Sequence, residues 1–187
     1  MADTAKQLFQ HHIRDMYDAE QKLVRALRRM AKNATDRTLA KGFTAHAKTT
    51  QRQVRRLEQV FRTLGKKPRR QPCAGVDGLI EEYSTFVREE KPGAEVLDAF
   101  SAGAGLKVEH YEIVAYKGLI DLAKQLGLNG EADLLKETLR EEEQTATELE
   151  AMSKTLGRAL PMDEEEQEQE AKGRKRSLPG ISRAAVR

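Results

Sequence analysis

Apolar residues recur along this chain at alternating gaps of four and three positions, the spacing of helices that pack side by side in a bundle. One segment with this spacing covers residues 4–32, and a second ends near Leu64, just before a glycine and a proline. Two further segments carry it over residues 101–126 and 135–156, and the sequence GLNG separates them. The pattern therefore predicts four long helices.

A shorter apolar segment interrupts the connection between the second and third long helices. The basic stretch KKPRRQPCAG, residues 66–75, leads into VDGLIEEYSTFVRE, and KPGAE follows. We expect a short fifth helix here, carried by a crossover connection. The fold class predicted for residues 1–160 is therefore all-α, a bundle of four long helices and one short one.

The end of the chain, residues 161–187, has no sustained apolar period and a high charge. We expect it to be a separate tail, disordered in the isolated protein. Its one apolar stretch, LPGISRAAV, has two interpretations: an unstructured end, or a docking peptide for an unknown protein partner.

Composition agrees with a bundle whose outer faces are solvated, since charged residues make up 34% of the chain, aromatic residues 5%, and tryptophan is missing. The single cysteine, Cys73, excludes an intramolecular disulfide and suits a reducing compartment. No apolar run approaches the roughly 20 residues of a membrane span. We expect a cytoplasmic protein that does not contact membranes.

The net charge of +3 is small, because basic runs are offset by the acidic run DEEEQEQE. DNA or envelope association through the basic loop and tail is the weakest of the functional hypotheses, and nucleic-acid binding is disfavoured because the basic clusters lack interleaved aromatic residues and elements that read bases.

Three glutamates occupy positions where their neighbours are apolar. Glu20, Glu112 and Glu142 each lie near the midpoint of a long helix, on the face that packs inward. Because the midpoints of helices in an up-and-down bundle lie at similar heights, these carboxylates should meet in one layer. Buried anions need a metal cation, protons or basic partners.

Two more side chains lie close to this layer. His46 comes one turn before an inward-facing threonine of the second helix, and Glu109 comes one turn before Glu112. The five candidate metal ligands are Glu20, Glu112, Glu142, Glu109 and His46. Oxygen-rich sites with an imidazole suit Fe or Mn. The alternative is that the glutamates reach solvent or pair with lysine and arginine, which leaves the protein metal-free.

Four stretches, DMYDAEQKL, DGLIEEY, KVEHYEIVAY and LLKETLREEE, resemble the YciE/YciF-type bacterial stress-protein family of the ferritin-like superfamily, over residues 4–157. The resemblance implies a ferritin-like up-down four-helix bundle with a crossover, association as a homodimer, and cytoplasmic induction under stress, with an activity that is poorly defined.

The ferritin-like di-iron pattern needs two Glu-x-x-His motifs, and neither is complete here. Thr145 stands where the last helix should supply histidine, and Thr50 and Gln53 stand where the second helix should supply glutamate and histidine. The favoured hypothesis is a stress protein with a degenerate, non-catalytic metal site. The alternative is a mononuclear or di-metal oxidoreductase or peroxide-handling protein, so whether the chain is an enzyme stays open.

The short helix predicts a dimer surface independently of the resemblance. It carries more apolar surface than one side of a short helix needs for packing on its own bundle. We expect part of this surface, including Ile80 and Tyr83, to face a second copy of the chain.

Overall fold

The structure is a computed structural model that describes residues 3–162, so the predicted tail lies outside the described residues from position 163 onward. Within residues 3–162 it contains helices and no strand, which confirms the all-α class. The helices are α1 (Ala5–Asn33), α2 (Arg37–Thr63), α3 (Ala74–Glu90), α4 (Ala94–Gln125) and α5 (Asn129–Arg158).

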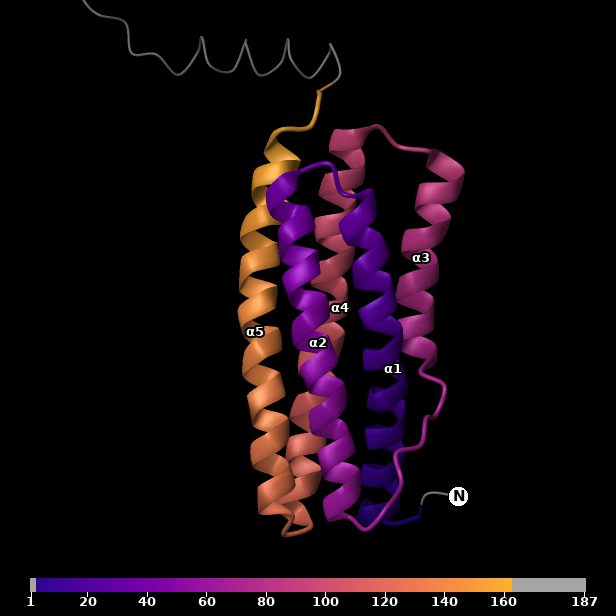
Figure 1. The fold of residues 1–187 in the computed structure, drawn as a ribbon, viewed down its shortest axis with the longest axis vertical. Coiled ribbons are helices and arrows are strands. Elements are labelled where there is room, and N and C mark those ends of the chain that lie inside the picture. The colour runs from indigo at the N-terminus through magenta and orange to yellow at the C-terminus, as the bar shows by residue number, and fades with distance from the viewer. Residues whose placement is uncertain (1–2, 163–187) are drawn as a thin grey trace, which may run out of the picture.

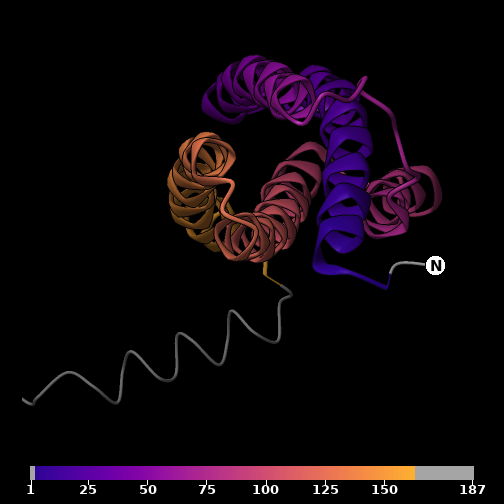
Figure 2. The same ribbon diagram turned by 90° about the horizontal axis from the view of Figure 1, so that it is seen from below.

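The four long helices stand side by side, and the views along and across the bundle agree on their order (Figure 1, Figure 2). Helices α1 and α2 run in opposite directions, as do α4 and α5, whereas α2 and α4 run in the same direction (Figure 1). A connection from the end of α2 to the start of α4 must therefore travel the length of the bundle, and α3 lies on the outside within that connection. The predicted crossover helix is confirmed.

Capping residues define where several helices begin or end. The Thr4 hydroxyl accepts a hydrogen bond from the backbone N–H of Gln7, and the Asp36 carboxylate accepts one from Leu39, so both long helices begin at an N-cap. Gly127, at a φ of +71°, takes the left-handed conformation that the tight turn between α4 and α5 requires.

The turn between α1 and α2 is held by a carboxylate from α4. Asp98, buried, accepts hydrogen bonds from the Thr35 backbone N–H at 2.9 Å, the Thr35 hydroxyl at 2.5 Å and the Asp36 N–H at 2.7 Å. These contacts tie the α1–α2 pair to the start of α4.

The long loop before α3 is anchored to α1 through Asp18. Its carboxylate accepts a hydrogen bond from the Cys73 backbone N–H and pairs with Arg70 at 2.6 Å and Lys22 at 2.5 Å. Burial alone would raise the pKa of Asp18, but these hydrogen bonds outweigh it and lower the pKa.

The apolar core is divided into two clusters along the bundle. One cluster includes Phe9, Ile13, Leu57 and Leu119, and the other includes Leu27, Leu39, Phe43 and Leu149. On α2, α4 and α5, the buried Thr50, Glu112 and Glu142 each lie in sequence between residues of the two clusters. The core therefore contains a polar layer near its middle, as the glutamate pattern predicted.

Candidate metal centre

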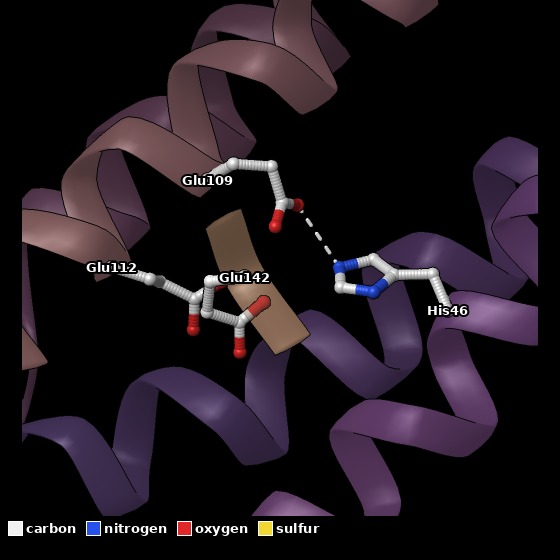
Figure 3. Close-up of side chains that lie close together, drawn as sticks. All are labelled: His46, Glu109, Glu112 and Glu142. Carbon is white, nitrogen blue, oxygen red and sulfur yellow. Dashed lines mark ion pairs between the residues drawn. The ribbon is translucent and has the colours of Figure 1, made fainter. Parts of the chain in front are cut away.

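Four buried side chains from three helices point toward one another in this layer (Figure 3). His46 comes from α2, Glu109 and Glu112 from α4, and Glu142 from α5. One donor atom from each of the four lies within 4.8 Å of the others. The exposed fraction is 6% for His46 and at most 1% for the three glutamates.

Helix geometry explains why these side chains meet. Glu109 and Glu112 are three residues apart, so they lie on the same face of α4, one turn from each other. The Thr50 hydroxyl, which faces inward on the same helix as His46, donates to the backbone oxygen of His46 at 3.0 Å. The Thr50 hydroxyl is therefore hydrogen-bonded within α2, and His46 is the residue of α2 that contributes a donor atom to the group of four.

The four side chains do not satisfy one another. His46 Nε2 lies 2.9 Å from Glu109 Oε1, which is an ion-pair distance, but the contact lacks hydrogen-bond alignment, since neither Glu109 oxygen has a hydrogen-bond partner. Both oxygens of Glu142, one oxygen of Glu112 and Nδ1 of His46 also lack one. A buried polar atom without a partner costs about 1–3 kcal/mol. Such a concentration of unpaired donors is what a cation site requires.

Burial and mutual repulsion control the protonation of the carboxyl groups. The pKa of Glu112 lies well above its ordinary value, first because burial disfavours the charged form and then because Glu20 and Glu109 lie nearby. Burial raises the pKa of Glu142 in the same way, with Glu112, Glu20 and Glu109 as the neighbouring charges. In the absence of a cation, burial and mutual repulsion therefore favour the protonated form of these carboxyl groups.

Glu20, the fifth predicted ligand, lies in the same layer but is not among the four residues whose donor atoms lie within 4.8 Å of one another. Its charge is still the first of the neighbouring charges that raise the pKa of Glu112. The Tyr116 hydroxyl donates a hydrogen bond to Glu20 Oε1. The pKa of Glu20 is raised to about 8, because burial outweighs the lowering effect of this hydrogen bond and Glu109 adds repulsion.

Sequence reasoning missed a second polar group beside the centre. Arg56 donates to both oxygens of Glu141, at 3.0 and 3.2 Å, and to the Thr138 hydroxyl at 2.7 Å. Gln53, which is fully buried, donates to the same carboxylate at 3.0 Å. Glu141 is therefore engaged and unavailable to a second metal. The available signal was the spacing of Gln53 and Arg56, three residues apart on the inward face of α2.

The donor set fits a single metal ion. Three carboxylates and one imidazole converge, are buried, and have lone pairs with no other partner. Hard oxygen donors with one nitrogen suit Fe and Mn better than metals that prefer thiolates. His110, which belongs to the same stretch of α4, is exposed and points away from the group.

A search of residues 3–162 for a helix apolar and long enough to span a membrane found none.

Comparison with known proteins places the chain among bacterial relatives. The family described as "Domain of unknown function (DUF892)" matches residues 4–160. Protein YciF of Escherichia coli K12 is 40% identical over 147 residues, which cover 78% of this chain and 88% of YciF.

Two solved structures share the whole arrangement of helices. The E. coli stress protein YciF superimposes with a TM-score of 0.79 at 39% identity, covering 83% of this chain and 98% of that one. YcfI from Rhodopseudomonas palustris gives a TM-score of 0.78 at 40% identity, covering 80% and 94%.

Proposed function

The chain belongs to the DUF892 family, and we propose that it is a cytoplasmic stress protein with a ferritin-like bundle that binds one Fe or Mn ion through His46, Glu109, Glu112 and Glu142. Its similarity to the E. coli stress protein YciF supports the physiological part. The observation that carries the chemical part is the set of buried, unpaired donor atoms on these four residues. The free, buried Cys73 is compatible with a reducing compartment.

Charge balance favours a redox-active ion over a purely divalent one. Three ionised carboxylates exceed the charge of a divalent cation by one and match that of a trivalent cation, and Fe and Mn reach the trivalent state. A bound ion of this kind would supply one-electron chemistry. His46 would supply a nitrogen donor to such an ion, and the three glutamates would supply the negative charge that favours its higher oxidation state.

The chain's own residues also hold a proton beside the centre. The Tyr116 hydroxyl proton is directed at Glu20 Oε1, while Glu20 Oε2 has no hydrogen-bond partner. Metal binding requires ionised carboxylates, so loading must release the protons that the raised pKa values retain. Affinity should therefore increase with pH.

Elemental analysis tests the metal site. Protein purified from cells grown with added iron or manganese should contain about one ion per chain, whereas a Glu109→Gln/Glu142→Gln double variant should contain almost none. Glu20→Gln is the matched control, because it alters a buried glutamate outside the group of four and should retain the ion. Wild-type protein that stays metal-free after both supplements would overturn the proposal.

A second candidate function, peroxide handling, is favoured by one observation. His46 lines a cavity of about 390 Å³ that lies between α2 and α5 and opens to the surface, so small solutes can approach the centre from one side. The test is whether metal-loaded protein, supplied with a reductant, consumes hydrogen peroxide over many turnovers. The Glu109→Gln/Glu142→Gln variant should lose this activity. If the metal-loaded wild type shows no turnover, the protein is a non-catalytic stress protein.

A further inference from the structure

The cavity between α2 and α5 has a chemical character of its own. We call it the α2–α5 groove, and its volume of about 390 Å³ lies within the range of pockets that hold small organic molecules, about 300–1,000 Å³. His46 lies partway along it, and the carboxylates of Glu109, Glu112 and Glu142 do not line it. Helices α2 and α5 are neighbours in the bundle (Figure 2).

One half of the groove is apolar. Leu39 and Phe43 precede His46 on α2, and Leu149 and Met152 face them from the last turns of α5. Phe43 and Leu149 also lie close to the α4 backbone, since a Cβ added at Gly105 would lie 3.3 Å from the Phe43 ring and 3.1 Å from Leu149. The floor of this half is therefore tightly packed against α4. Its apolar lining suits a hydrocarbon chain.

The other half is polar, and two arginines and two glutamates line the groove. Thr49 and Arg52 follow His46 on α2, and Arg140, Glu141 and Gln144 face them from α5. Both glutamates are engaged, since Glu141 pairs with Arg56 and Glu148 accepts a hydrogen bond from Gln144 at 2.6 Å. The Arg140 guanidinium has no hydrogen bond or ion pair with any residue in the range 3–162. Arg52 is half exposed, and its guanidinium lies 3.7 Å from the Glu141 carboxylate. Because that carboxylate already pairs with Arg56, this contact leaves Arg52 able to bind another anion.

We propose that the α2–α5 groove binds an amphipathic monocarboxylate of the medium-chain fatty-acid class. The carboxylate would pair with Arg140 and Arg52, since guanidinium groups bind carboxylates with two parallel hydrogen bonds. The hydrocarbon chain would pass His46 and lie against Phe43 and Leu149. This site needs no metal ion, so it stands or fails independently of the proposed metal centre.

Calorimetric titration of the full-length, metal-free protein with decanoate tests the proposal. We expect saturable binding at one site per chain. Decanol, which has the same chain but no charge, and the Arg140→Glu variant should each weaken binding about tenfold, the effect of losing one charged hydrogen-bonded contact. Equal affinity for decanol and decanoate would overturn the proposed carboxylate recognition.

Gly42 allows the groove to be filled without disturbing the core. It lines the groove, and a Cβ built there meets no atom within 4 Å. Gly42→Leu should therefore abolish decanoate binding while circular dichroism stays unchanged. Gly118→Leu is the matched control, because Gly118 is also an exposed helical glycine with open space around its Cβ but lies on α4, outside the groove, and should bind as wild type.

Two further results would overturn the proposal. One is the absence of saturable decanoate binding by the wild type. The other is decanoate binding that persists in Gly42→Leu, which would place the ligand elsewhere.

Discussion

His46 Nε2 and Glu109 Oε1 lie 2.9 Å apart, and this contact joins α2 to α4 (Figure 3). Helices α2 and α4 lie diagonally opposite, since each packs chiefly against α1 and α5 (Figure 2). A direct contact between diagonal helices is possible only at the bundle axis. The candidate metal centre therefore lies near the axis of the bundle.

Removing one buried ionisable carboxyl should stabilise the metal-free protein, because near neutral pH the folded chain must either bury its charge or take up a proton. Glu112→Gln eliminates a carboxyl that is fully buried next to Glu109 and Glu142, and we expect unfolding to cost about 1–2 kcal/mol more than in the wild type. Calorimetry in the presence of a chelator measures this, and Glu89→Gln, which changes an exposed glutamate, should have almost no effect. A lower melting temperature for Glu112→Gln would reveal a specific cationic partner for this carboxylate.

The metal-free protein should lose stability as the pH rises. Glu20 has a pKa of about 8 in the folded protein against an ordinary 4.5, and the pKa values of Glu112 and Glu142 are raised as well. Because the folded state binds more protons than the unfolded state in this window, the stabilisation is complete below about pH 4.5 and is lost as the pH rises through 8.

Melting temperatures measured between pH 5.5 and 8.5 with a chelator should therefore fall by several degrees, and the fall should be smaller in Glu112→Gln. A constant melting temperature across this range would mean that the buried carboxyl groups do not change protonation. With saturating metal the trend should weaken or reverse, because the ion replaces the protons.

The turn between α1 and α2 should depend on Asp98. Asp98→Asn replaces an acceptor of three hydrogen bonds by a group that can accept only through one oxygen, and we expect a loss of about 2–3 kcal/mol. Urea denaturation measures the loss. Asp121→Asn on the same helix, where the carboxylate is exposed, should stay within about 0.5 kcal/mol of wild type.

The start of α3 should not tolerate a side chain at Gly75. A Cβ there would lie 2.6 Å from the ring of Tyr111, whose hydroxyl is 3.1 Å from the buried Cys73 sulfur. Gly75→Ala must displace this ring and should cost about 1–3 kcal/mol. Gly78→Ala, one turn later in open space, should instead stabilise by about 0.5–1 kcal/mol. Similar effects at the two positions would contradict the close approach of Tyr111.

The homodimer stays a prediction. The structure shows that a residue other than Tyr83 is the better one to mutate in testing it. Tyr83 is only 8% exposed and packs within its own chain, so a charge there would damage the bundle itself. Val114 on α4 is 71% exposed, the highest fraction among the large apolar residues described. Light scattering at micromolar concentration should give the mass of two chains, and Val114→Glu should halve it without loss of helicity. Wild-type protein with the mass of one chain would rule out the dimer.

The sequence by itself determined the helices and the height of the polar layer. Apolar spacing is a local property, so the first helix, predicted over 4–32, is observed over Ala5–Asn33, and the crossover helix is longer than predicted by a few residues. Helix length fixes the height of each midpoint, which is why Glu112 and Glu142 were correctly expected to meet.

Only the tertiary structure decided which side chains complete the site. Periodicity gives the inward face of a helix, but the partner of an inward side chain depends on the neighbouring helices and on competing hydrogen bonds. Tyr116 thus engages Glu20, Arg56 engages Glu141, and His46 reaches across the bundle to Glu109. These pairings join residues far apart in the chain, and their choice depends on helix rotation and side-chain rotamers, which no local pattern of residues contains.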